Sequence, residues 1–160
     1  MKEKISIKEI LLFLAVSFAA YWFANAVLWI PWKINQWFGI ITMICLVPIL
    51  WGFSSYYCLI RTSFVHWKKS VAVVATMFLI IAVISDVFFF AVWRGIPDEL
   101  YHSTTFAAYA LIVLAPIIVG IVLKRVRDKK QKPISRKSLF ITGGLGVLFF
   151  ALTLYSVQYW

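Results

Sequence analysis

Five long apolar stretches, separated only by short connections, constrain this chain more than any other feature. Each contains the roughly 20 mostly apolar residues that a helix needs to cross a bilayer. Within hydrocarbon the backbone must satisfy its own hydrogen bonds, so each stretch is expected to be helical. The sequence therefore predicts an all-α integral membrane protein, a bundle of five transmembrane helices in one membrane domain, residues 1–160. The predicted spans are approximately residues 7–30, 37–60, 70–93, 104–123 and 138–160.

Composition supports the same class of protein. Of the 160 residues, 63% are hydrophobic and only 14% are charged, whereas soluble domains carry about 25% charged residues. In a soluble protein the net charge of +10 would suggest a nucleic-acid partner. The distribution of the basic residues explains this charge differently, and no nucleic-acid partner is expected.

The basic residues predict the orientation in the membrane. Fourteen of the 16 lysines and arginines lie at the N-terminus, between the second and third stretches, or between the fourth and fifth. Only Lys33 and Arg94 lie in the other connections. Because an excess of Lys and Arg in short loops marks the cytoplasmic face, we expect a multi-pass protein of the cell membrane. Its N-terminus would be cytoplasmic and its C-terminus outside.

One carboxylate, Asp86, lies well inside a predicted span. A charged side chain at that depth costs about 2.5–3.5 kcal/mol on insertion scales, and such residues usually face the bundle interior or a water-filled cavity. Intramembrane ionisable residues mark functional sites by default. The leading hypothesis is therefore an outward-facing pocket around Asp86 that binds, or helps to transport, a small ligand or cation.

Four other polar residues, one on each of the remaining helices, are predicted at a similar depth. They are candidate ligand-binding residues together with Asp86, and they are Asn25, Thr42, Tyr109 and Thr153. In the alternative interpretation Asp86 only hydrogen-bonds Asn25 or a tyrosine hydroxyl and so joins two helices. The sequence leaves both interpretations open.

The connection between the fourth and fifth spans is strongly basic. Lysines and arginines near an anionic membrane surface each contribute about 1 kcal/mol to lipid binding. Anionic lipids at the cytoplasmic face are therefore a candidate partner, although a role in topology alone explains the charges equally well. The candidate headgroup-binding residues are Lys124, Arg125, Arg127, Lys129, Lys130 and Lys132.

The sequence favours no enzyme. The two histidines, His66 and His102, are predicted on opposite sides of the membrane, and the HExxH motif of zinc proteases is absent. One intramembrane carboxylate does not suffice for a two-aspartate protease. Glu99 and His102 have Glu-x-x-His spacing, but a single copy is weak evidence for a metal site. No catalytic residue, metal ligand or cofactor is assigned, and we find no family signature.

Two further classes of function remain as alternatives. The first is an accessory or assembly subunit of a larger membrane complex, and the second is a lipid-modifying enzyme with its site near Glu99 and His102. Small residues in the first and fifth stretches, Ala15-xxx-Ala19 and Gly143 to Gly146, permit close helix contact within the chain. A homodimer or a membrane-protein partner is the alternative use of these faces.

The first stretch also resembles a signal peptide. Basic residues at the N-terminus precede an apolar run, which is followed by Ala24-Asn25-Ala26, a small-residue sequence of the kind that signal peptidases cleave. The apolar run continues beyond this site to Ile30, and bulky aromatic residues precede it. We therefore expect the stretch to be retained as a transmembrane helix.

Overall fold

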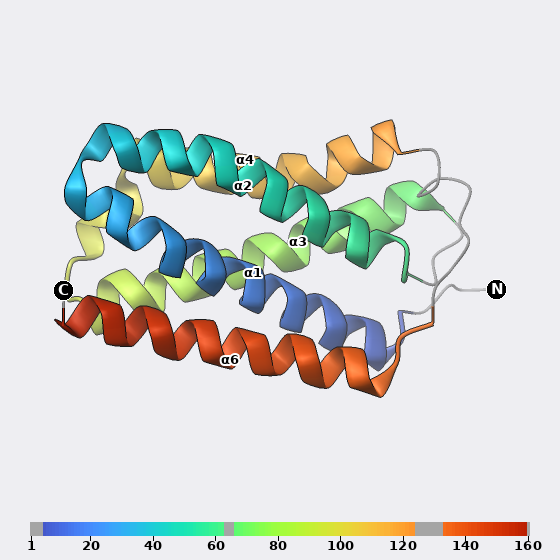
Figure 1. Cartoon of the computed structure of the whole chain (residues 1–160). Coiled ribbons are helices and arrows are strands. Elements are labelled where there is room, and N and C mark those ends of the chain that lie inside the picture. The colour runs from blue at the N-terminus through green and yellow to red at the C-terminus, as the bar shows by residue number, and fades with distance from the viewer. Residues whose placement is uncertain (1–4, 63–65, 124–132, 160) are drawn as a thin grey trace.

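Five long helices form a bundle in the computed structural model, which describes residues 5–62, 66–123 and 133–159. Each is long and apolar enough to cross a membrane, as the sequence predicts. No strand occurs within the described ranges. In chain order the elements (Figure 1) are α1 (Ile7–Ile34), α2 (Gln36–Leu59), α3 (Trp67–Asp86), η1 (Val87–Trp93), η2 (Pro97–Tyr101), α4 (Ser103–Val122) and α6 (Arg136–Tyr159).

The chain reverses direction between successive long helices, so each end of the bundle collects alternate connections (Figure 1). One end holds the turn between α1 and α2, the η2 segment and the end of α6; we call it the Asn35 end. The opposite end holds the starts of α1, α3 and α6 and is called the Arg61 end. Among the described basic residues only Lys33 and Arg94 belong to the Asn35 end. The arrangement is compatible with the predicted orientation, which stays a prediction.

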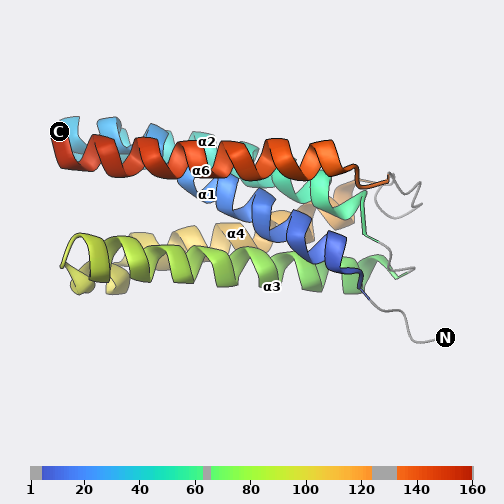
Figure 2. The ribbon, with the colours of Figure 1, turned by 90° about the horizontal axis from the view of Figure 1, so that it is seen from below.

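Helix α1 lies at the centre of the bundle. In Figure 2 the helices α3 and α4 lie side by side, α6 and α2 lie on the other side, and α1 runs obliquely between them. It packs against α2, α3 and α6. Its side chains Leu12, Phe13 and Trp22 are almost completely buried. Cleavage near Ala24 would therefore remove much of the core.

Many large apolar side chains point outwards instead. Phe140 is 81% exposed, Trp37 73% and Ile49 72%. Exposed large apolar side chains occur on all five long helices, which suits contact with lipid. The described helices thus have an apolar interior and an apolar exterior, which is the pattern expected of a membrane bundle.

Local signals explain where α1 and α2 begin. Ser6 and Glu9 form a capping box at the start of α1, in which each side chain accepts a hydrogen bond from the other residue's backbone N–H. Asn35 is the only residue between α1 and α2, and its side chain accepts a bond of 2.7 Å from the backbone of Trp37. This cap starts α2 immediately, so the two helices form a tight hairpin.

The predicted first span stops at about residue 30, just before Pro31, but α1 continues through this proline to Ile34. Proline lacks a backbone N–H and disturbs the preceding turn, but only the last turn follows it here. The Pro31 carbonyl still accepts a bond of 3.1 Å from the Asn35 N–H. The last turn therefore survives, and it places Trp32 and Lys33 on the helix.

The small residues of α1 and α6 bring these helices into close contact. A Cβ atom at Gly146 would lie 2.8 Å from the Phe18 ring and 3.4 Å from the Ala19 backbone nitrogen. At Gly143 and Gly144 such an atom would meet nothing within 4 Å. Gly146 is thus the glycine of this group that the α1–α6 contact requires.

Candidate functional site

A cavity of about 590 Å³ opens in the bundle toward the Asn35 end. Residues of α1, α2, α4 and the continuous α3–η1 helix line it, together with residues of η2. Sites for small molecules typically have volumes of about 300–1,000 Å³ and mostly apolar walls with a few polar groups. We call this space the Asp86 cavity, after the residue at its deep end.

Asp86 is 7% exposed and lines the cavity. The Tyr21 hydroxyl on α1 donates a hydrogen bond to its Oδ1 atom. The Tyr109 hydroxyl on α4 is a second hydrogen-bonding partner of the same carboxyl group. The carboxyl group therefore joins three helices at this depth.

The structure brings three of the five candidate ligand-binding residues together. Asn25 and Tyr109 line the cavity with Asp86, and the Asn25 amide donates a bond of 3.0 Å to the Tyr21 carbonyl. Tyr21 itself was not among the candidates. Its position four residues before Asn25 places it on the same face of one helix, but this spacing alone does not predict a contact with Asp86.

The other two candidates do not line the cavity. The Thr42 hydroxyl donates to the Phe38 carbonyl of its own helix at 2.8 Å. Thr153 is fully buried, and its hydroxyl lies 2.9 Å from the Phe149 carbonyl and 3.2 Å from that of Trp22. It therefore contributes to the contact between α6 and α1.

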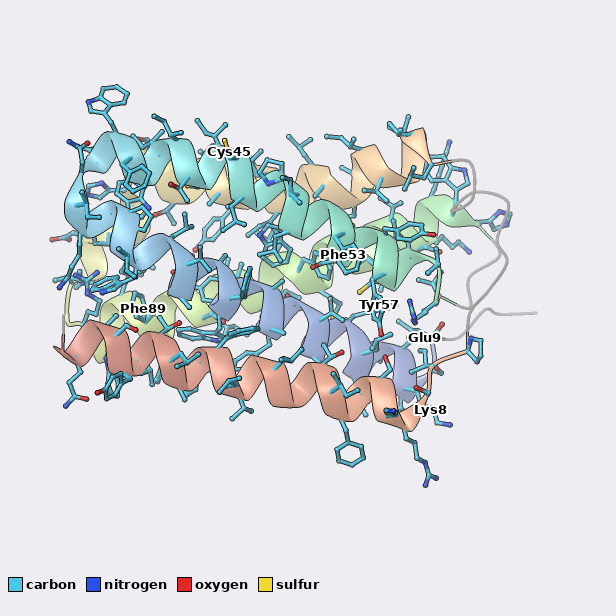
Figure 3. All side chains as sticks on the ribbon, viewed as in Figure 1. Lys8, Glu9, Cys45, Phe53, Tyr57 and Phe89 are labelled. Carbon is cyan, nitrogen blue, oxygen red and sulfur yellow. The ribbon has the colours of Figure 1, made fainter. Side chains whose placement is uncertain are left out.

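Aromatic rings form much of the cavity wall. The rings come from α1, α2 and η1, and they belong to Trp29, Trp32, Trp51, Phe89 and Phe90. Phe89 is 2% exposed and points into the bundle near the Asn35 end (Figure 3). Aromatic faces attract cations as well as apolar groups. The wall can therefore hold an organic cation or an apolar ligand.

Charged and polar groups surround the cavity mouth. They are Lys33 and Arg94, which the sequence analysis used only for topology, and Glu99 and His102. The Lys33 Nζ atom lies 5.2 Å from the centre of the Trp29 ring, and the Arg94 Cζ atom lies 5.1 Å from it. Two cations thus lie beside one aromatic ring at the mouth.

A π-helical segment, η1, starts immediately after Asp86. Its wider turn is visible in the hydrogen bond from the Arg94 N–H to the Phe89 carbonyl, five residues earlier, at 3.0 Å. Such π-turns are frequent at functional sites. The sequence predicts an ordinary helix to Trp93, because residues 87–93 contain neither glycine nor proline. The π-segment sets the direction in which Phe89 and Arg94 point.

The described residues do not suggest a metal site. Within residues 5–62, 66–123 and 133–159, no three histidines, cysteines or carboxylates form a group that could hold a metal ion. Glu99 and His102 lie at the mouth, whereas Asp86 lies at the deep end. The candidate lipid-binding residues lie outside the described ranges, and these are Lys124, Arg125, Arg127, Lys129, Lys130 and Lys132.

Comparison with known proteins adds no candidate function. No protein-family model matches the chain, and no curated protein or solved structure matches it either. The proposal for its function therefore rests on the Asp86 cavity and its surroundings.

Proposed function

We propose that this chain is a multi-pass protein of the cell membrane that binds, or helps to transport, a small ligand or cation in the Asp86 cavity. The observation that carries the proposal is a buried carboxyl group facing a cavity of about 590 Å³. Among the described residues, no lysine, arginine or histidine forms an ion pair with Asp86. The charge needed to neutralise an ionised Asp86 would then come from the ligand.

Hydrogen-bonding capacity supports the same conclusion. An ionised carboxylate accepts at about four positions, and the two tyrosine hydroxyls occupy about half of them. A buried polar group that lacks partners is costly. A ligand with an ammonium group or other hydrogen-bond donors would supply the remaining partners of the Asp86 carboxylate. The purely structural role for Asp86 explains the two tyrosines, but it gives no reason for the adjacent cavity.

The cavity would open to the outside in the predicted orientation. A single cysteine introduced at Asn35 should then react with an impermeant thiol reagent in intact cells, whereas one at Lys68 should not. Cys45 and Cys58 are replaced by alanine in both variants so that only the introduced thiol is measured. Labelling at position 68 with none at position 35 would show that the topology is the reverse of the predicted one and that the cavity opens to the cytoplasm.

The proposal is tested by ligand-dependent thermal unfolding of the detergent-purified protein. The probes are tetramethylammonium, choline and benzyltrimethylammonium, three organic cations of increasing apolar surface. We expect at least one to raise the midpoint of wild-type unfolding, since a ligand at 100 times its Kd stabilises by about 2.7 kcal/mol. Asp86→Asn preserves side-chain size and polarity but removes the charge, so it should abolish the shift.

Asp98→Asn is the matched control. It removes the same charge from an exposed residue of η2 that does not line the cavity, and its thermal shift should equal that of the wild type. A shift of equal size in the Asp86→Asn protein, or no cation-dependent shift in any of the three proteins, would contradict the proposal.

A further inference from the structure

The two cations at the mouth lack a carboxylate partner among the described residues. Lys33 and Arg94 lie near the same Trp29 ring, and within those ranges neither forms an ion pair with Glu99 or any other acidic side chain. Like charges held close together repel each other. An anion bound between them would remove this repulsion, and the planar fork of arginine matches the oxygen geometry of phosphate.

A further hydrogen-bond donor belongs to Trp29, which forms part of the wall of the Asp86 cavity. The Nε1 atom of Trp29 is buried and has no hydrogen-bond partner among the described residues. Buried polar groups are nearly always hydrogen-bonded. This unpaired donor belongs to the same ring that both cations approach, and a small shift of the ring would be needed for it to donate to a bound anion.

The deep end of the cavity has the opposite polarity. Asp86 supplies the negative group there, and aromatic rings surround the space between it and the mouth. The Arg94 guanidinium extends back to 5.8 Å from the Phe89 ring. Phe89 follows Asp86 by three residues, or about 4.5 Å of helix rise. Asp86, Lys33 and Arg94 line one cavity of about 590 Å³, so a single dipolar ligand held there would face both the acidic and the basic groups.

We propose that the ligand is a zwitterion in which a short alkyl linker joins a phosphate to an ammonium group, as in phosphocholine and phosphoethanolamine. The phosphate lies between Lys33 and Arg94, and the ammonium group points toward Asp86 and the aromatic wall. This inference rests on the proposed function and specifies its ligand class. The same chemistry occurs in soluble molecules and in lipid headgroups.

Calorimetric titration of the full chain in maltoside detergent tests the ligand class. The probes are phosphocholine, choline, inorganic phosphate and dihexanoyl-phosphatidylcholine. We expect phosphocholine to bind at least ~10-fold more tightly than choline or phosphate, because it contacts both ends of the site. Tighter binding of the short-chain lipid would identify a lipid headgroup as the source, and equal binding would identify a soluble zwitterion.

Two variants test which residues bind the phosphate end of the ligand and which bind its ammonium end. The double substitution Lys33→Gln/Arg94→Gln should remove the advantage of phosphocholine over choline while choline still binds. Asp86→Asn should weaken both. The matched control is Arg136→Gln/Lys137→Gln, which removes the same charge at the Arg61 end and should leave all affinities unchanged.

The outcomes separate this inference from the proposed function. If choline binds as tightly as phosphocholine and Asp86→Asn abolishes both, the zwitterion is overturned and the cation-binding function stands. If phosphate alone binds and Asp86→Asn has no effect, both are overturned. If none of the four probes binds, the ligand class is overturned, and the benzyltrimethylammonium shift decides the function separately.

Discussion

Trp22→Ala is expected to lower the free energy of unfolding by about 3–5 kcal/mol, the usual cost of truncating a large buried aromatic side chain. Trp22 is 1% exposed and packs edge-on against Tyr21, Phe89 and Phe150, whose ring centres lie 5.1, 5.9 and 4.7 Å away. These contacts join α1, η1 and α6. Removal of the indole would leave a cavity where three elements meet.

The loss can be measured by unfolding the protein in mixed micelles of increasing denaturing-detergent content, followed by circular dichroism. Trp37→Ala is the matched control, because Trp37 is 73% exposed and its truncation creates no cavity. Trp22→Phe should cost less than alanine, since the ring contacts remain and a buried N–H without a described partner disappears. Equal stability of the Trp22→Ala and Trp37→Ala proteins would show that this aromatic cluster does not hold the bundle together.

Deletion of Val92 is expected to abolish the tighter binding of phosphocholine relative to choline, while choline binding and the helical content are retained. A π-turn contains one residue more than an α-turn needs, so removal of one residue from η1 restores ordinary helical hydrogen bonding. Val92 is 70% exposed, and its side chain contributes little packing. The deletion would shorten this helix by one residue and change the position of Arg94 relative to the Trp29 ring.

Val92→Ala is the control for this deletion, because it shortens the same side chain and keeps the register. Its preference for phosphocholine over choline, measured by calorimetric titration, should match that of the wild type. Circular dichroism checks that the deletion variant remains helical. An unchanged preference for phosphocholine in a folded deletion variant would show that the wider turn is not needed to place Arg94 at the site.

The spans could be predicted to within a few residues because burial in lipid depends on local apolar length. The direction in which each side chain points could not be predicted. In a membrane bundle both the core and the lipid-facing surface are apolar, so hydropathy gives no face on which to place Thr42 or Thr153. Both hydroxyls bond carbonyls of their own helices, a local solution that needs no pocket.

Asp86 could be singled out because an intramembrane carboxyl group is costly wherever it points. Its partners were harder to identify. Tyr21 is one aromatic residue among many in the first span, and only the packing of α1 against α3 shows that it reaches Asp86. The π-segment has no compositional signal, because the width of the turn is a property of the packed structure.

The central position of α1 has a consequence for biogenesis. Synthesis proceeds from the N-terminus, so α1 is made before α2, α3 and α6, and in the predicted membrane topology each of these would be inserted after its packing partner. The segment that carries Asp86 would meet a cost of about 2.5–3.5 kcal/mol for this residue on insertion. The Tyr21 hydroxyl of α1 donates a hydrogen bond to Asp86, and this bond would offset part of that cost. The order of the helices along the chain would thus allow them to assemble in sequence, with the hydrogen-bond donor Tyr21 inserted before its acceptor Asp86.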